Sequence, residues 1–347
     1  MYAALWQRQT EGLAQQCQQF HNGLNYDAPV AEPEVLMQGL TLAREFYHAC
    51  RPVLWEEIPD IMARAAIGLV GEGSEYFGCD DAASRDHDFG PAFCLWLPHA
   101  ELQRHAPRIE AALRHLPAHF GGFDSRLAPA KRLGRVGPLA VEDFYTFFTG
   151  LSELPATWQE WLAIPEYQLA ACTNGEVFED GAGEFTRRRR ALLAGYPDDV
   201  RLKKMAARCM IMAQAGQYNL PRCLQRGDGP AAMFCVTRFA EAALSLVYLC
   251  NARYMPFYKW AARLASSLPI LGAEVTQTVN RLAAMPLRGA EDMEATRVAE
   301  DFCAAVARHL RHMGLSQDTG NWLWAHGPQI MRHVREPQLR HMDMLQG

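Results

Sequence analysis

Residues 65–74, with the sequence AAIGLVGEGS, join an apolar run to two glycines and a serine. The run before Gly71 is too short for a core helix and is followed by glycines, so it predicts a buried β-strand. Glycine lets the backbone turn sharply and approach a ligand closely. Ser74 would then begin a helix, where free amide hydrogens and the helix dipole favour a phosphate. The stretch therefore predicts a strand, a phosphate-binding turn and a helix in succession.

Two aspartates follow Ser74 after a spacer long enough for a short helix and a return to a neighbouring strand. Residues 86–97 are predicted to form that strand, although Pro91 belongs at a strand edge or a bulge. On a strand, Asp86 and Asp88 point to the same face and His87 points away. Two carboxylates so placed repel each other, and Mg²⁺ relieves this repulsion while bridging nucleotide phosphates. Because phosphoryl transfer needs mainly positioning and charge neutralisation, the pattern predicts a metal-dependent phosphoryl-transfer site.

The rest of the chain divides by its patterns into two parts. Before residue 186 we expect helices at 34–50 and 101–116, a strand at 135–141, and a late strand or hairpin within 169–185. After it, helical patterns dominate, with prolines between them or at their edges, at 200–216, 231–253, 257–268, 272–284 and 291–313. The predicted fold class is α+β: a small mixed-sheet domain with N-terminal helices at 1–185, then an α-helical bundle at 186–347.

Charge and hydropathy exclude several classes of protein. The formal net charge is −5, so no overall basic field indicates a nucleic-acid partner, although such a partner stays possible. The first 19 residues lack the pattern of a signal peptide, and no stretch approaches the roughly 18 apolar residues that span a membrane. The ten cysteines form no CxxC pair and are expected to be buried thiols in a reducing compartment. We therefore expect a cytoplasmic protein that is not bound to a membrane.

Taken together, Gly73-Ser74, the spacer and Asp86-His87-Asp88 resemble the signature of the DNA polymerase β-like nucleotidyltransferase superfamily. More closely, residues 71–91 resemble a bacterial family filed as domain of unknown function 4037. That resemblance continues at residues 173–178, 196–217 and 254–260. It implies a small catalytic domain of polymerase β-like fold followed by helices, as in aminoglycoside (kanamycin-type) nucleotidyltransferases. His87 departs from the pattern, because the position between the two aspartates is normally apolar.

The resemblance also implies roles for individual residues. Gly73 and Ser74 would hold the nucleotide phosphates, and Asp86 and Asp88 would bind Mg²⁺ at the catalytic centre. The superfamily commonly uses a third carboxylate on a later strand. Glu142, just after the third predicted strand and beside Asp143, is the residue that we expect in this role. The structural alternative is that the aspartates cap a polar turn and that Ser74 is only a helix N-cap.

Lysines in two segments are expected to contact the phosphates. Lys259 lies among aromatic residues where two predicted helices join, and a comparable lysine approaches the nucleotide in aminoglycoside-type enzymes. Lys203 and Lys204 follow the arginine run 187–190 and lie in a stretch that the resemblance covers. The alternatives are a solvated helix face for the charge run and a surface lysine beside a core aromatic cluster.

The predicted reaction is transfer of a nucleoside monophosphate, AMP from ATP, to a hydroxyl of a small-molecule acceptor, with release of pyrophosphate. The base that takes the acceptor proton stays open, with Glu176, Asp180 and Glu184 as further carboxylates that serve equally well as turn residues. A second hypothesis places a tRNA end or a protein side chain in the acceptor position, as in toxin-type enzymes. A third is a non-catalytic nucleotide-binding regulatory module, which gains weight if no third carboxylate approaches the aspartates.

Overall fold

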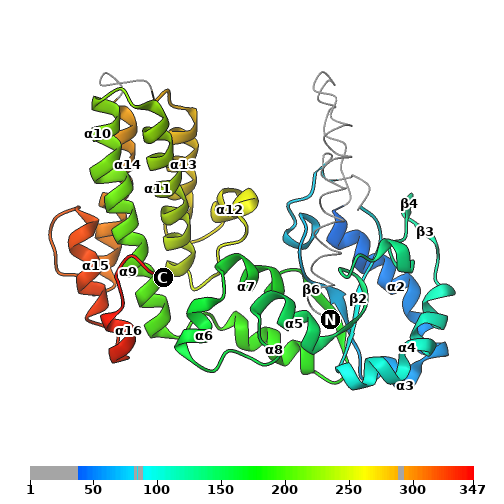
Figure 1. The fold of residues 1–347 in the computed structure, drawn as a ribbon. Coiled ribbons are helices and arrows are strands. Elements are labelled where there is room, and N and C mark those ends of the chain that lie inside the picture. The colour runs from blue at the N-terminus through cyan, green and yellow to red at the C-terminus, as the bar shows by residue number, and fades with distance from the viewer. Residues whose placement is uncertain (1–37, 82–83, 85–88, 288–292) are drawn as a thin grey trace.

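A computed structural model of the chain describes residues 38–81, 84, 89–287 and 293–347. Asp86, His87 and Asp88 lie outside the described residues, so their predicted place on a strand is not tested. The described residues form a small mixed sheet with helices on both faces and, beside it, a helical bundle (Figure 1). This agrees with the predicted α+β class.

The sheet has four strands in the order β5-β2-β1-β6. Their bounds are β1 Ala66–Leu69, β2 Cys94–Leu97, β5 Gly137–Ala140 and β6 Glu176–Asp180. β1 runs antiparallel to β2 and to β6, whereas β5 runs parallel to β2. Gly68 pairs with Cys94, and Cys94 pairs with Gly137. The loop that follows β1 therefore lies at the end of the sheet where β2 and β5 begin.

Strand β2 begins later than predicted, at Cys94. Gly90 has a φ of +158° and Pro91 follows it, so the chain reaches the sheet as irregular backbone instead of as a strand. The late strand predicted within residues 169–185 is β6, and a helix precedes it instead of a hairpin partner.

Helices cover both faces of the sheet, and aromatic side chains form the contacts. Phe93 packs against Phe46 at a ring-centroid distance of 5.9 Å, whereas Trp96 packs against Phe185 at 4.0 Å on the opposite face. The helices of this half are α2 Gly39–Glu57, α3 Pro59–Met62, α4 His99–Arg114, α5 Val141–Thr149, α6 Trp158–Ala163, α7 Glu166–Thr173 and α8 Glu184–Leu193. A separate two-stranded ribbon joins β3 His119–Phe120 to β4 Phe123–Asp124.

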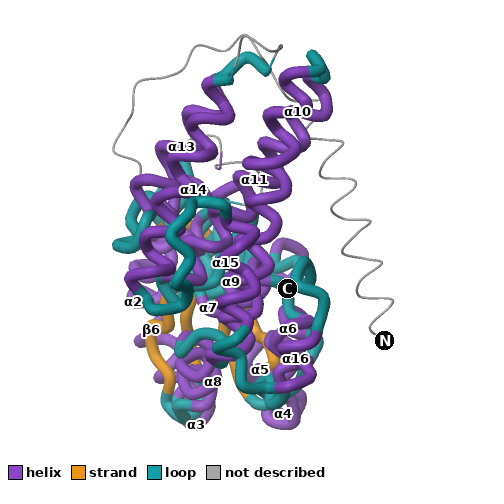
Figure 2. The backbone as a smooth tube through the Cα atoms, turned by 90° about the vertical axis from the view of Figure 1, so that its left-hand side faces the viewer, coloured by secondary structure: helices purple, strands orange, loops and turns teal. Residues whose placement is uncertain are grey.

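The helical bundle begins with a long rod in which α9 continues through a π-helical stretch, Ala213–Asn219, into α10. Figure 2 shows α11, α13 and α14 running together toward one end of the molecule. The bounds are α9 Asp198–Met212, α10 Leu220–Gln225, α11 Gly229–Cys250, α12 Tyr258–Ala265, α13 Gly272–Ala284, α14 Glu294–His312, α15 Leu323–Met331 and α16 Pro337–His341. Each helix predicted after residue 186 is present, and α13 has the predicted bounds.

Helix α11 corrects one expectation about hydropathy. It is long and apolar enough to cross a membrane by length and composition, which the sequence analysis did not foresee. In the structure 61% of its apolar window is buried, and the core helix of a bundle has the same properties.

Candidate functional site

A cavity of about 710 Å³ lies where the loop after β1 meets α7 and the start of α12. Its size is within the range of roughly 300–1,000 Å³ that is common for small-molecule sites. We call it the Ser74 cavity. Three parts of the chain line it: the loop after β1 (Glu72, Gly73, Ser74, Glu75, Phe77, Cys79, Asp81), the connections between strands (Arg126, Arg135) and the helical side (Tyr167, Phe257, Lys259, Trp260, Arg263).

The turn after β1 requires glycine. Gly73 has a φ of +141°, and a Cβ added there would lie 2.5 Å from Glu75 Oε2 and 2.9 Å from Tyr76 Cδ2. No larger residue fits without displacing these side chains. Among the residues that the structure describes, none accepts a hydrogen bond from the backbone N–H of Gly73 or of Ser74. This wall of the cavity therefore presents backbone donors to a ligand.

The turn is held in place by a segment a hundred residues later in the chain. The side-chain amide of Asn174 accepts a hydrogen bond from Gly71 N at 3.0 Å and donates one to Gly71 O at 2.7 Å. Gly175 N donates to Tyr76 O at 3.0 Å, and Arg189 Nη2 donates to the carbonyls of Asn174 and Gly175. The cavity loop is thus tied to the β6 side of the sheet by main-chain and amide bonds.

Ser74 is followed by less helix than predicted. The helix is a single 3₁₀ turn, Glu75–Phe77, because Gly78 adopts a left-handed conformation with a φ of +62° and ends it. The carbonyl of Ser74 accepts hydrogen bonds from Phe77 N and Cys79 N, and its hydroxyl does not cap the turn. Any phosphate held here would be bound by the loop amides and not by a long helix dipole.

Charge in the cavity favours an anion. Four cations line it (Arg126, Arg135, Lys259, Arg263) against three carboxylates (Glu72, Glu75, Asp81), which leaves one positive charge in excess among the described residues. Glu75 and Arg126 form a buried ion pair at 3.4 Å, and burial raises the pKa of Glu75 although Arg126 opposes this. Asp81 accepts hydrogen bonds from the N–H and hydroxyl of Ser84. For Glu72, no described residue provides a hydrogen bond or an ion pair.

Aromatic rings from both halves of the molecule meet at the cavity. Phe77 lies against Trp260 with ring centroids 5.0 Å apart, and Tyr167 meets Phe257 edge-on at 5.9 Å. Arg263 Nη1 also donates to Cys79 O at 3.0 Å, so α12 is joined to the loop by a polar contact beside the aromatic one. Flat apolar faces beside cations suit a ligand with both a ring and negative charge.

Three of the predicted site residues come together here: Gly73, Ser74 and Lys259 all line the cavity. The Nζ of Lys259 lies 5.4 Å from the ring centroid of Trp260. Asp86 and Asp88 are outside the described residues, and among the described ones no group of three or more His, Cys, Asp or Glu side chains could hold a metal ion. The magnesium site therefore stays a prediction.

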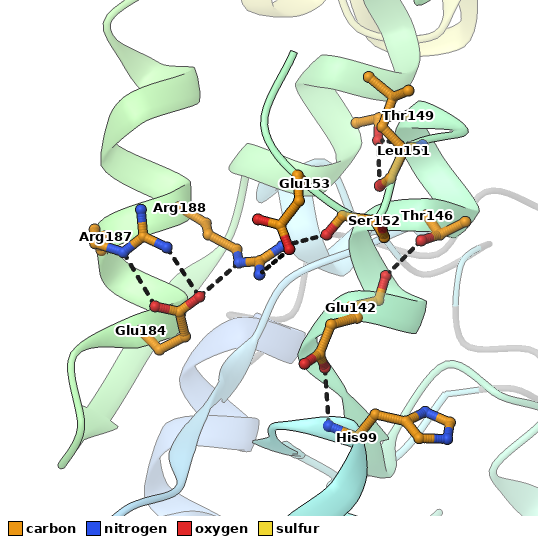
Figure 3. A network of polar contacts seen from close by, with 10 residues as sticks. All are labelled: His99, Glu142, Thr146, Thr149, Leu151, Ser152, Glu153, Glu184, Arg187 and Arg188. Atoms are coloured by element: carbon orange, nitrogen blue, oxygen red, sulfur yellow. Dashed lines mark hydrogen bonds and ion pairs between the residues drawn. The ribbon is translucent and has the colours of Figure 1, made fainter. Parts of the chain in front are cut away.

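Glu142 lies near the opposite end of the strands from this cavity. It follows the end of β5, whereas the loop after β1 lies where β5 begins. Its carboxylate accepts a hydrogen bond from His99 N at 2.9 Å, at the start of α4 (Figure 3). The carboxylate of Asp143 lies 3.2 Å from Nδ1 of the His99 ring. Glu142 thus caps a helix and does not line the Ser74 cavity, and because Asp86 and Asp88 lie outside the described residues, its predicted part in the metal site is not tested.

Lys203 is also placed elsewhere. Its side chain is 0% exposed, and its ammonium donates to the carbonyls of Asp343, at 2.8 Å, and Gln346. Burial lowers its pKa to about 8. Because these carbonyls occupy it inside the helical half, Lys203 does not reach the Ser74 cavity, which corrects that prediction.

The arginine run and the three alternative base residues are used in the architecture. Arg187 and Arg188 both pair with Glu184, and Arg188 also bonds Ser152 and Glu153 (Figure 3). Asp180 accepts hydrogen bonds from Gly183 N and Thr186 N, and Glu176 pairs with Arg44. None of the three carboxylates lines the cavity in the described part of the chain.

Four residues of the cavity were not predicted from the sequence: Arg126, Arg135, Tyr167 and Arg263. They are isolated in the sequence, in no motif, and the fold alone brings them to one cavity. Lys259 could be predicted because aromatic residues adjoin it in the sequence. Arg263 lies one turn further along α12, on the same face of the helix.

Comparison with known proteins supports one part of the resemblance. The model of a family described as a domain of unknown function (DUF4037) matches residues 161–261. That range contains Asn174, Gly175 and Lys259, and thus the helical wall of the cavity, but not the Gly-Ser and Asp-x-Asp motifs. No curated protein and no solved structure matches the chain.

Proposed function

We propose that the protein is a Mg²⁺-dependent nucleotidyltransferase that moves AMP from ATP to a hydroxyl of a small-molecule acceptor. The observation that carries the proposal is the Ser74 cavity itself. A glycine-serine loop forms one wall, with amides that donate to no described residue, and cations and aromatic rings from the helical half form the other. Backbone amides and a lysine suit phosphates, and aromatic faces suit a purine base.

In this proposal the triphosphate lies along Gly73 and Ser74, with Lys259 neutralising charge, and the base lies against the rings of Trp260 and Phe257. Asp86 and Asp88, which follow the same loop in the sequence, would hold Mg²⁺, which neutralises phosphate charge when bound. Carboxylate oxygens are the donors that this ion prefers. One oxygen of the nearby Asp80, Oδ1, is buried and accepts no hydrogen bond from the described residues, so the donor chemistry of the loop fits a hard cation.

The reaction would proceed by attack of the acceptor oxygen on the α-phosphorus of ATP. The bond from that phosphorus to the oxygen bridging to the β-phosphorus breaks, and pyrophosphate leaves. The acceptor proton passes to a carboxylate, for which we propose Glu72, since it lines the cavity without a partner among the described residues. Glu72 thereby replaces Glu142 in the proposed site.

A non-catalytic nucleotide-binding module is the second candidate, and the position of Glu142 favours it. With that residue at the far edge of the sheet, no carboxylate on β5 approaches the loop, and Arg135 precedes the strand instead. Such a module would bind a nucleotide in the same cavity without turnover.

Calorimetric titration of each nucleoside triphosphate, with Mg²⁺ and then with a chelator, tests the proposal. We expect Mg²⁺-dependent binding of ATP that weakens at least about 100-fold in the Asp86→Asn, Asp88→Asn protein, since two metal ligands are lost. Glu142→Gln is the matched control and should bind ATP as the parent does. Undiminished binding in the double variant would refute the metal site. Binding without pyrophosphate release, when acceptors from a small-molecule extract are added, would favour the second candidate.

A further inference from the structure

One pair of cysteines in the helical bundle differs from the others. Nine cysteines are described, and seven of them are buried. Cys223 and Cys235 are the two that are partly exposed, and their Sγ atoms lie 4.0 Å apart. The expectation of buried thiols therefore holds for most of the described cysteines but not for this pair. A reagent in solution can reach these two thiols, and the two thiols can reach each other.

The pair is brought together by the turn between α10 and α11. Cys223 lies on α10 and Cys235 on α11. Asp228 N donates to the carbonyl of Cys223 at 3.0 Å, and the Asp228 side chain accepts a hydrogen bond from Ala231 N at the start of α11. Gly227 has a φ of +68°, the left-handed conformation that ends a helix in such a turn. Hydrogen bonds of the backbone thus hold the two helices, and with them the two thiols, close together.

The two thiols are not equivalent. Burial, and after it the neighbouring Cys223 thiol, raises the pKa of Cys235 to about 11, although Arg238 opposes this. Cys235 therefore keeps its proton near neutral pH, and because the thiolate is the nucleophile, the first attack falls to Cys223. Once the Cys223 sulfur is bonded to another group, it no longer raises the pKa of Cys235. Cys235 then loses its proton more readily and can act as the resolving thiol.

We propose that Cys223 and Cys235 form a reversible disulfide by exchange with a small-molecule disulfide, and that this bond stabilises the α10–α11 hairpin. The Cys223 thiolate attacks one sulfur of that molecule, which releases one thiolate and leaves a mixed disulfide on Cys223. Cys235 loses its proton to solvent and attacks the Cys223 sulfur, and the second thiolate leaves. The two protein thiols are oxidised, and the small-molecule disulfide is reduced to two thiols, which take up the two protons.

The geometry allows this bond with a small movement. A disulfide bond is about 2.05 Å long, so the two sulfurs must approach each other by roughly 2 Å. Rotation of two partly exposed side chains can provide that movement. A covalent link between residues 12 apart in the sequence removes conformations from the unfolded chain, which is the reason for the expected stabilisation.

The pair lies apart from the proposed nucleotide site. Figure 1 and Figure 2 both show α10 at the end of the helical bundle away from the sheet. Neither cysteine lines the Ser74 cavity or the second cavity, of about 860 Å³, that Tyr167 and Phe257 also line. The disulfide proposal therefore does not rest on the proposed function, and failure of either one leaves the other standing.

Incubation of the full chain with excess glutathione disulfide, followed by acid quenching, proteolysis and mass spectrometry, tests the proposal. We expect the peptides of Cys223 and Cys235 to be joined, with a mass about 2 Da below their sum. Cys235→Ser should stop at a mixed disulfide on Cys223, since no resolving thiol remains. Cys223→Ser should react at least about ten-fold more slowly than the parent, because Cys235 is protonated. Cys250→Ser, on the same helix as Cys235, is the matched control and should form the link as the parent does.

Urea denaturation provides the second measurement. The oxidised parent should have a higher urea midpoint than the reduced parent, and dithiothreitol should return it to the reduced value. Neither Cys223→Ser nor Cys235→Ser should show this rise. Four results would each overturn the proposal: no reaction of either cysteine, mixed disulfides that persist on the parent without the link, a link that forms only in unfolded protein, or an oxidised midpoint no higher than the reduced one.

Discussion

Tyr167 and Phe257 line two cavities, and the walls of these cavities are held in place by different interactions. At the Ser74 cavity the side chain of Asn174 bonds both backbone polar atoms of Gly71, and Gly175 reaches the carbonyl of Tyr76, so backbone geometry sets the loop. In the neighbouring cavity, which Tyr167 and Phe257 also line, buried charges are paired: Glu166 accepts a hydrogen bond from Arg208 and forms a longer ion pair with Lys204, at 3.7 Å. Substitutions that change the backbone conformation should disturb the first cavity, and substitutions that remove a charge should disturb the second. Substitutions of each type should therefore separate the two cavities.

The largest effect is expected at Gly175. It has a φ of +57°, and a Cβ there would lie 1.9 Å from the carbonyl oxygen of Leu69. Gly175→Ala must push β6 away from β1, and we expect it to lower the free energy of unfolding by about 3 kcal/mol or more. Urea denaturation measures this loss, and Mg²⁺-ATP binding should disappear with it.

Gly183→Ala separates the close contact from the backbone angle. Gly183 also has a positive φ, of +74°, but no atom lies within 4 Å of an added Cβ. Its substitution should cost roughly 1 kcal/mol, the ordinary strain of a left-handed alanine. If Gly175→Ala were no more harmful than Gly183→Ala, the Ser74 cavity would not depend on that tight join.

A contrast of similar size is expected between two cations that line the second cavity, Arg208 and Lys204. Arg208→Met removes the hydrogen-bonded partner of a buried carboxylate and should lower the free energy of unfolding by about 3 kcal/mol. Lys204→Met removes an ion pair with Glu166 at 3.7 Å, longer than the 2.9 Å contact of Arg208, so we expect a smaller loss, below about 1 kcal/mol. Thermal and urea unfolding of both variants provide the measurement. Equal losses would mean that the longer ion pair of Lys204 stabilises Glu166 as much as the contact of Arg208 does.

The smallest effect is a pH dependence from Lys203. Its pKa is about 8 in the folded protein and 10.5 as the ordinary value, so between these values the unfolded chain holds more protons. Its contribution to stability should rise as the pH rises from about 8 toward 10.5 and stay flat below pH 8. Comparing the free energies of unfolding in urea of the parent and of Lys203→Met at pH 7.5 and 9.5 should show the difference growing by no more than about 2 kcal/mol. A difference that shrinks with pH would contradict the assigned direction.

Local patterns predicted the parts of the site that depend on adjacent residues. β1 and the turn at Gly73 follow from an apolar run that ends in glycines. β2 was predicted too long because Gly90 and Pro91 interrupt the chain before it. The role of Asp86 and Asp88 stays a prediction.

Residues placed by topology could not be predicted. Glu142 follows a strand as expected, but the parallel pairing of β5 with β2 carries it to the far edge. Lys203 is bound by carbonyls about 140 residues later in the chain, and no pattern around it indicates them. Arg126 and Arg263 reach the Ser74 cavity from opposite halves of the molecule for the same reason. When the partner of a charged residue lies far away in the sequence, it can be identified only once the fold is known.

The contact of Phe77 with Trp260, and the bond from Arg263 to Cys79 beside it, join the two walls of the Ser74 cavity. In a nucleotidyltransferase these two contacts would affect the rate of product release. A product held between those walls would leave only when they separate. This separation breaks the two contacts, and such motions take microseconds to milliseconds. Product release, and not bond breaking, would then limit turnover.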